Sequence, residues 1–408
     1  MAKPEPLQIP LSQLQIGLTV KLPLSWTNHP FLRNRVDIKS NAEIALIRSL
    51  GVPYVIVIKG AELISIEEEL PLEEPAELEP IIDEPDVRQE LRKSMRLSQK
   101  RFVTCINDSR SIFSKVVTDP EGAYRLSATL VEDLLTHVKE TDNPSLALVG
   151  SGENDVSVTQ HGVSVAVLAM MIGQALNLPA KDLRDIALGS LFHDIGKLKV
   201  PDVIRRKRGA LSDSEANFLQ KHPNFGYEMM NRSGLFPPEV LHIILHHHEL
   251  LDGTGYPEGL KGNKIPMTTQ IVSLANDFDT QLNQSHIASP QVALGYLFKN
   301  RVGKHAQPLI AVLVKILGIY PPGTLVRLTD NCVGKVMMTT KEVKQPHVWA
   351  CAPDGSDATL RLLIEEDVNI DQVVKIEDLT EGAIKSLKAS GAISFYFSAV
   401  STSTLSDS

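Results

Sequence analysis

The histidines of this chain gather in one stretch, at a spacing that suits a shared metal centre. Seven of the twelve lie between His161 and His248. Successive helices of a bundle can each place one or two ligands around a common ion. The residues that best fit this pattern are 25 to 32 residues apart, about one helix and one loop: His161, His193 with Asp194, His222, and His247 with His248. Imidazole and carboxylate together suit Fe, Mn, Zn or Ni, and the residue types do not choose among them.

The adjacent carboxylate and a nearby lysine indicate phosphoryl chemistry. Neighbouring residues of a helix point about 100° apart, so His193 and Asp194 can reach one central ion only if both project toward the bundle interior. Lys197 follows His193 by about one helical turn and could reach a phosphate oxygen or the leaving group. We therefore assign catalytic roles to Asp194 and Lys197.

Each of these residues, taken alone, also has a structural explanation. His161 suits packing or capping at the start of an apolar helix, and His222 suits a helix end. We interpret His242 and His246 as packing histidines. The recurrence of all the candidate ligands on successive helices is what makes chance a poor explanation.

Helices must bring these ligands together, and the sequence predicts them from Val87 to about Ile319. The run before His193 is apolar, and ionisable groups at that depth are uncommon without a partner or a metal. On the first of these helices, Met95 and Phe102 could line the seam of a homodimer, although packing within the chain explains them more simply.

Changes of pattern divide the chain into five segments, and the predicted fold class is mainly α. The segments are a small α/β module over 1–66, an acidic Pro-rich linker over 67–86, a helical connector over 87–145, a metal-dependent phosphohydrolase domain over 146–320, and a small β-rich C-terminal extension over 321–408. In the first segment, residues 41–51 predict a helix and residues 53–59 a buried strand. Past Gly391 we expect a frayed tail.

Composition excludes several classes of function. The net charge of −8 is concentrated in residues 67–86, which carry ten acids and no Lys or Arg. The rest is nearly neutral and could accept an anionic ligand, but it lacks the broad basic surface of a protein that binds duplex nucleic acid. The longest apolar run, residues 163–178, is too short to span a bilayer. With three scattered cysteines and no visible signal peptide, we expect a cytoplasmic protein without membrane insertion.

Five short motifs resemble those of the HD-GYP family, a subset of the HD-superfamily metal phosphohydrolases that hydrolyse the second messenger cyclic di-GMP. They are HDIGK at 193–197, PD at 201–202, KH at 221–222, HHELLDGTGYPEGLKG at 247–262 and IP at 265–266. The resemblance runs from His161 to about Tyr320. The N-terminal segment is similar to a domain of unknown function that often precedes HD-GYP domains.

The resemblance implies an HD-superfamily helical bundle that holds two or three divalent metal ions, with Fe and Mn favoured. The implied ligands are His161, His193, Asp194, His222, His247 and His248. Gly255, Tyr256 and Pro257 would form part of the loop that shapes the guanine and phosphate pocket. The implied reaction is hydrolysis of cyclic di-GMP to linear pGpG, GMP or both, through a hydroxide that bridges the metals. Two ions roughly 3.5–4 Å apart can hold such a hydroxide and both displaced oxygens of an in-line substitution at phosphorus. Asp194 could bridge both ions, because a carboxylate has two oxygens to share.

The chain departs from the family pattern at three places. The position of a usual Asp ligand holds Asn276, a neutral and weaker ligand, while Asp277 is adjacent and Asp279 keeps the second Asp of that motif. An arginine expected near the substrate is missing from NQSHI at 283–287. The usual KPG is KRG, within a basic patch whose Lys207 and Arg208 either replace a lost phosphate contact or form a solvated loop.

These departures leave two functions open. One is an active cyclic di-GMP phosphodiesterase. The other is a degenerate HD-GYP domain that binds cyclic di-GMP, or a cyclase-type signalling partner, without turnover. Another HD-type nucleotide phosphohydrolase is disfavoured, because the GYP loop is intact and no triphosphate-binding Gly-Lys loop is present.

Overall fold

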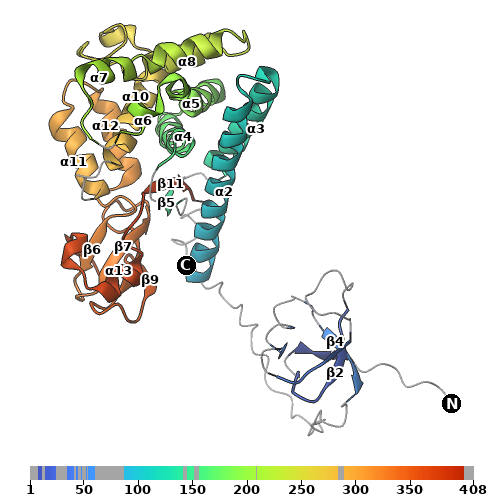
Figure 1. The fold of residues 1–408 in the computed structure, drawn as a ribbon. Helices are drawn as coiled ribbons and strands as arrows, with labels where there is room; N and C mark the ends of the chain where they lie inside the picture. The colour runs from blue at the N-terminus through green and yellow to red at the C-terminus, as the bar shows by residue number, and fades with distance from the viewer. Residues whose placement is uncertain are drawn as a thin grey trace. The chain divides into compact units, whose positions relative to one another are not determined.

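The computed structural model divides the chain into two compact units, Met1–Asp83 and Glu84–Ser408 (Figure 1). It describes residues 8–11, 14–23, 35–40, 43–44, 47, 52, 54–59, 87–140, 145–150, 156–207, 209–283 and 289–398. The acidic linker predicted over 67–86 therefore lies outside the described residues.

The first unit contains a four-stranded antiparallel sheet in the order β1-β4-β2-β3. Its strands are β1 (Gln8–Pro10), β2 (Thr19–Lys21), β3 (Arg35–Asp37) and β4 (Tyr54–Lys59). Alternate side chains of a strand share one face, and Val55 and Val57 of β4 are accordingly buried. The predicted strand is confirmed as β4. Within the predicted helix over 41–51, the described residues 43, 44 and 47 are helical.

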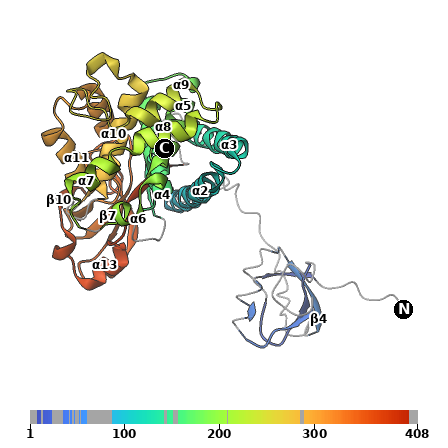
Figure 2. The same ribbon diagram turned by 45° about the horizontal axis from the view of Figure 1, so that its top comes forward.

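The second unit confirms the mainly α fold class. Its helical elements up to the end of the bundle are α2 (Val87–Lys115), α3 (Pro120–Lys139), α4 (Val158–Ala175), α5 (Ala180–Phe192), η3 (Ile195–Lys199), α6 (Asp202–Arg205), α7 (Asp213–Leu219), α8 (His222–Asn231), α9 (Pro238–His246), η4 (Gly262–Lys264), α10 (Met267–Leu282), α11 (Pro290–Asn300) and α12 (Gln307–Leu317). Helices α2 and α3 form a long antiparallel hairpin along one side of the bundle (Figures 1 and 2).

Helix α4 forms the centre of the helical core. Residues 162–173 are all buried, and the helix packs against α5, α10, α12 and the α2–α3 hairpin. Its length and mean hydropathy of 1.2 would suit a membrane span, but 78% of it is buried inside the fold. It is therefore the core helix of this bundle, and its packing fixes the first turn, which carries His161.

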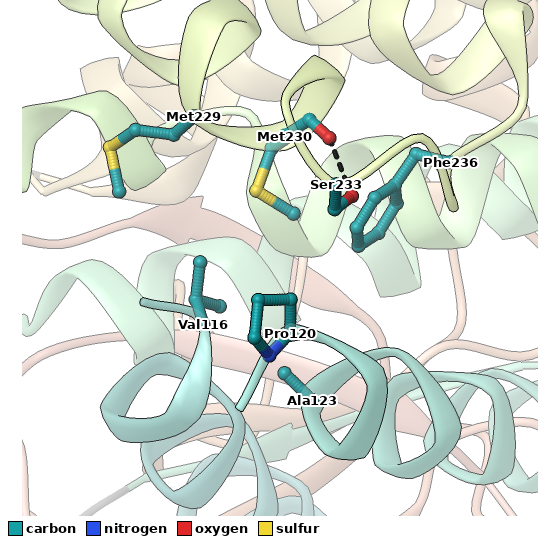
Figure 3. A pocket seen from close by; sticks show the side chains of 7 residues that line it. All are labelled: Val116, Pro120, Ala123, Met229, Met230, Ser233 and Phe236. Atoms are coloured by element: carbon teal, nitrogen blue, oxygen red, sulfur yellow. Dashed lines mark hydrogen bonds between the residues drawn. The ribbon is translucent and has the colours of Figure 1, made fainter. Parts of the chain in front are cut away.

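The turn of the α2–α3 hairpin packs against the C-terminal end of α8 (Figure 3). The side chains that meet there around a small cavity are those of Val116, Pro120, Ala123, Met229, Met230, Ser233 and Phe236. The Phe236 ring lies edge-on to both Tyr124 of α3 and Phe192 of α5, with ring centroids 5.2 and 5.3 Å away. Because Phe192 directly precedes His193, the hairpin is packed against the helix that carries a candidate ligand.

The predicted dimer seam on α2 is not supported for Phe102. This side chain is fully buried within the chain and lies edge-on to Tyr396, with ring centroids 6.1 Å apart. Met95 is half-buried and packs beside Leu91 and Ala147. The simpler explanation, packing within the chain, is therefore confirmed for Phe102.

The C-terminal residues form a seven-stranded sheet that includes a strand from before the bundle. The strands of this sheet are β5 (Leu146–Val149), β6 (Leu325–Leu328), β7 (Val333–Met338), β8 (His347–Cys351), β9 (Thr359–Leu362), β10 (Ile370–Val373) and β11 (Ser394–Phe397). Two short helices, η5 (Ile376–Asp378) and α13 (Glu381–Leu387), lie between β10 and β11 in the sequence. The order is β10-β6-β7-β5-β11, with β8 on β7 and β9 on β8. Since β5 pairs with both β7 and β11, the extension is part of the second unit and is no separate appendage.

The prediction of a frayed tail past Gly391 is wrong for β11. Residues 394–397 pair antiparallel with β5, and all four are buried. Their aromatic side chains, among them Phe395, are part of the main hydrophobic core. Burial of this apolar surface stabilises the ordered strand. Residues 399–408 lie outside the described part of the chain.

Buried His347 on β8 predicts a loss of stability in acid. Burial lowers its pKa from 6.5 to about 4, and neither ring nitrogen has a hydrogen-bond partner among the described residues. Because the folded-state pKa is the lower one, unfolding takes up a proton between these values. The free energy of unfolding therefore falls as the pH drops from about 6.5 to 4. At pH 5 the protonation of His347 in the unfolded chain has lowered the free energy of unfolding by about 2 kcal/mol.

Urea unfolding of the wild type and His347→Leu at pH 7.5 and pH 5 measures this contribution. We expect the wild type to lose about 2 kcal/mol more than the variant over this range. Equal losses in the two proteins would contradict a buried neutral imidazole at this position.

Candidate metal centre

Six of the predicted ligands meet in two groups that share one carboxylate. Nitrogen or oxygen atoms within each group lie within 4.8 Å of one another. The first ligand group consists of His161, His193 and Asp194, and the second of Asp194, His222, His247 and His248. The predicted convergence of ligands from separate helices is thus present in the fold.

The two oxygens of Asp194 face different groups. Oδ2 lies 3.8 Å from His161 Nε2 and 3.4 Å from His193 Nε2. Oδ1 lies 3.2 Å from His222 Nε2 and 3.9 Å from His247 Nε2. One oxygen per group is the arrangement that a carboxylate needs to bridge two ions.

The ligands come from the ends of helices that are packed closely together. His161 lies in the first turn of α4, His193 and Asp194 join α5 to η3, and His222 begins α8. His247 and His248 follow α9. At Gly196 the backbones of η3 and α8 nearly touch, since a Cβ there would lie 1.9 Å from the His222 carbonyl oxygen. Only glycine allows this approach.

Backbone carbonyl groups fix the orientation of three of the imidazoles. Nδ1 of His193, His222 and His247 lies 2.7 to 2.9 Å from the carbonyl oxygen three residues earlier. A carbonyl can only accept, so each Nδ1 carries a proton, and Nε2 is the ring atom left to face the centre. Hydrogen bonds of this kind orient the histidine ligands of metal sites.

Electrostatics keeps four of the candidate ligands in the form that binds a cation. Burial lowers the pKa of His193, and lowers those of His247 and His248 well below 6.5. Burial alone would raise the pKa of Asp194, but the nearby Lys197 charge and the His193 and His222 contacts outweigh it, and the pKa lies well below 3.8. Neutral imidazoles and an ionised carboxylate are the protonation states that metal ligation requires.

Two features show that the centre fits a divalent metal. His193 Nε2 is buried and has no hydrogen-bond partner in the part of the chain that the structure describes. Nε2 of His222 and Nε2 of His247 are 3.2 Å apart, so two neutral rings would direct their lone pairs at each other. Buried polar atoms without partners are costly. Cations bound by the two ligand groups would satisfy these atoms.

Helix α10 places Asn276 and Asp279 beside His161 of the first ligand group and directs Asp277 elsewhere. Asn276 Oδ1 lies 2.9 Å from His161 Nε2, and Asp279 Oδ2 accepts from His161 Nδ1 at 2.6 Å. Burial alone would lower the pKa of His161, but the Asp279 hydrogen bond and charge raise it above 6.5. Asp277 instead binds Arg301 and His305 at 2.7 and 2.9 Å. Of these neighbouring α10 residues, Asn276 and not Asp277 is thus the one that contacts His161 Nε2.

The predicted phosphate contacts differ in their placement. Lys197 Nζ donates to Asp194 Oδ2 at 2.6 Å, which puts a partly exposed ammonium at the edge of the centre. Lys207 instead binds Glu215 at 2.6 Å and holds the pKa of that carboxyl at about 2. The structure therefore favours a surface ion pair for Lys207, and Arg208 lies outside the described residues.

The GYP loop is packed against the second ligand group. The Tyr256 ring stacks on His248, with centroids 4.5 Å apart and planes 19° apart. A Cβ at Gly255 would lie 2.4 to 2.5 Å from backbone atoms of residues 248–250, so this glycine is required for close packing of the loop. Tyr256 and Pro257 are half-buried beside the centre.

Glu249 is the main site residue that sequence reasoning missed. Its side chain is buried, and its carboxylate accepts the backbone N–H groups of Glu258, Gly259 and Leu260 at 2.7, 3.1 and 2.9 Å. Its backbone carbonyl accepts from Ser273 of α10 at 3.2 Å. An acid directly after the ligand pair and ahead of a glycine-rich loop was the available signal. Its role is to close the loop that carries Tyr256.

Replacing Glu249 with Gln should loosen this loop. Gln has one accepting oxygen, so at least one backbone N–H group would face an amide NH₂. Losing a hydrogen bond to a charged group costs about 1.5–3 kcal/mol, which is roughly a 10- to 100-fold faster exchange of the amide hydrogens at residues 258–260. Glu258→Gln, which changes an exposed carboxylate and keeps its own N–H, is the matched control. Unchanged exchange in Glu249→Gln would contradict the assignment.

Comparison with known proteins identifies the family. Residues 142–305 match the model of the HD domain, and residues 7–126 match a domain of unknown function, DUF3391. A cyclic di-GMP phosphodiesterase of Pseudomonas aeruginosa is 30% identical over 341 residues, which cover 81% of this chain and 81% of that protein. The chain belongs to the HD-GYP family. HD-GYP membership places it among the phosphodiesterases of the HD superfamily.

Two further HD-GYP relatives match less of the chain. The cyclic di-GMP phosphodiesterase response regulator RpfG of Xanthomonas campestris is 36% identical over 190 residues, 44% of this chain and 50% of that protein. A solved HDG"Y"P protein from Bdellovibrio bacteriovorus is 19% identical, with a TM-score of 0.44, over 76% of this chain and 99% of that one.

Proposed function

We propose that this HD-GYP protein hydrolyses cyclic di-GMP to linear pGpG, GMP or both. The observation that supports it most is the division of Asp194 between two ligand groups, with one oxygen toward each. The Pseudomonas and Xanthomonas relatives carry the same substrate in their names. The two groups would hold two divalent cations, Fe or Mn by preference, with Asn276 as a further ligand of the first.

When bound, the cations would lower the pKa of a water molecule and withdraw charge from the phosphodiester. The protein's own residues would do the rest. Asp194 would fix the distance between the two ligand groups, because one of its oxygens faces each of them. The Lys197 ammonium, at the edge of the centre, would bind a phosphate oxygen or the departing ribose oxygen. Tyr256 and the loop closed by Glu249 would contact one guanine base of the dinucleotide, the one nearest to His248. The His248 ring stacks on the Tyr256 ring.

Asn276 favours a second candidate, a domain that binds the dinucleotide without turnover. The residue is buried at the ligand position, but it brings no charge to a dication. Such a centre would hold its first cation weakly. Dinucleotide binding would then survive while hydrolysis fails.

Chromatography of reactions with metal-loaded protein separates the two candidates. The purified chain, loaded with Mn or Fe and analysed for metal content, is incubated with cyclic di-GMP. We expect linear pGpG or GMP to form, and His193→Ala to remove the activity while the chain stays folded. Binding of the dinucleotide without product at full metal occupancy would support the second candidate and reject the first.

A further inference from the structure

Strand β11 lies outside the residues matched to the HD domain, but it contacts both helices that complete the first ligand group. The match ends at residue 305, and β11 covers residues 394–397. The strand packs against α4 and pairs with β5, and its four residues are buried. A segment far from the HD domain in the sequence is therefore packed against the core helix of the bundle.

The contact with α4 falls on the residue next to a ligand. Gln160 Nε2 donates to Ser394 Oγ at 3.2 Å, and both side chains are fully buried. Gln160 Oε1 has no partner in the described part of the chain. Ser394 thus supplies a hydrogen bond whose loss would leave the buried amide of Gln160 without a partner for its NH₂ group. Gln160 directly precedes His161 in the first turn of α4.

The contact with α10 is made by the next residue of the strand. The Phe395 and Phe278 rings are stacked, with centroids 6.3 Å apart and planes 16° apart. Phe278 lies between Asn276 and Asp279, both of which contact His161. One short strand therefore touches the two helices whose side chains surround His161.

The strand itself is held from the opposite side by the α2–α3 hairpin. Ser98 Oγ of α2 donates to the Phe397 carbonyl oxygen at 2.8 Å. The Tyr396 hydroxyl lies 2.8 Å from His137 Nδ1 of α3 and 3.3 Å from Cys105 Sγ of α2. These contacts fix the position of β11 without using any residue of the metal centre.

We propose that Ser394 is a positioning residue for the first cation subsite. It holds Gln160, and through it the first turn of α4, so that His161 faces Asp194 and Asn276. The second ligand group depends on other contacts, because α8 packs on η3 and α9. The inference rests on the proposed function only in requiring that the first ligand group binds a cation.

Titration of Mn²⁺ into the metal-free full-length chain tests this assignment. His161→Ala and His222→Ala identify the ion bound by each ligand group. We expect Ser394→Ala to weaken the first ion about 10-fold, the scale of lost support behind a metal ligand, and to leave the second unchanged. The matched control is Ser398→Ala, which changes a buried serine that directly follows the same strand and contacts Ser94 of α2. It should alter neither ion.

Two results would overturn the proposal: unchanged affinity for both ions in Ser394→Ala, or an equal loss at both. Thermal unfolding of the metal-free proteins shows whether each variant is folded. If Ser394→Ala is unfolded, Gln160→Leu removes the same hydrogen bond from the helix side and must give the same selective loss. If the wild type binds no ion that depends on His161, the proposed function fails first, and this inference falls with it.

Discussion

Replacing Asp194 with Asn is expected to lower cyclic di-GMP turnover by about 10³-fold or more. Each Asp194 oxygen faces a different ligand group, at 3.4 Å from His193 Nε2 and 3.2 Å from His222 Nε2. An amide offers one oxygen, no charge and an NH₂ that repels a cation. One change therefore weakens both ions. Steady-state turnover and metal content, measured on the same preparations, check this expectation.

Asp185→Asn is the matched control for this experiment. Asp185 is a buried carboxylate on α5 that binds Lys181 at 2.8 Å, much as Asp194 binds Lys197 at 2.6 Å. We expect the control to keep both ions and its turnover to stay within about twofold of the wild type, because Asp185 belongs to neither ligand group. An Asp194→Asn protein that keeps both ions and more than a tenth of the turnover would contradict the bridging role.

The opposite effect is expected from Asn276→Asp. Asn276 Oδ1 already lies 2.9 Å from His161 Nε2, so the substitution places a charged oxygen where a neutral one now lies. Cation affinity rises with the number of charged ligands, and we expect the first ion to bind roughly 10- to 100-fold more tightly. Turnover at limiting Mn²⁺ should rise with occupancy of this subsite.

Asn300→Asp controls for the added charge alone. Asn300 is exposed at the end of α11. Its replacement by Asp changes the net charge by the same amount but outside the centre. Isothermal titration of Mn²⁺ into the two variants and the wild type measures the difference. If Asn276→Asp leaves the affinity of the first ion unchanged, Asn276 is not a ligand.

The convergence of the candidate ligands could be predicted from the sequence because their signal is local. HDIGK, KH and HHE each place a ligand at a helix end, and the spacing brings those ends to one centre. The structure adds residues whose roles depend on tertiary contacts. Asp279 orients His161 from a different helix, and Glu249 accepts three amides from residues 258–260. Neither partner can be read from the spacing of the motifs.

The failed prediction and the alternatives that the sequence left open have the same origin. The tail past Gly391 resembles a frayed end because the partner of β11, residues 146–149, lies far away along the chain. Phe102 could face a second subunit until Tyr396 is known to cover it. For Lys207 the sequence leaves a phosphate contact and a solvated loop open, because it does not show that Glu215, eight residues later, pairs with this lysine at 2.6 Å. Patterning predicts which faces are buried better than it predicts which elements cover them.

The most direct test of the paired centre is electron paramagnetic resonance of the metal-free chain titrated with Mn²⁺. A carboxylate shared by two ligand groups predicts that two ions bind per chain and that their spins are exchange-coupled. The coupling should disappear in Asp194→Asn. A single ion per chain, or two ions with the uncoupled six-line spectrum of isolated Mn²⁺, would contradict a centre bridged by Asp194.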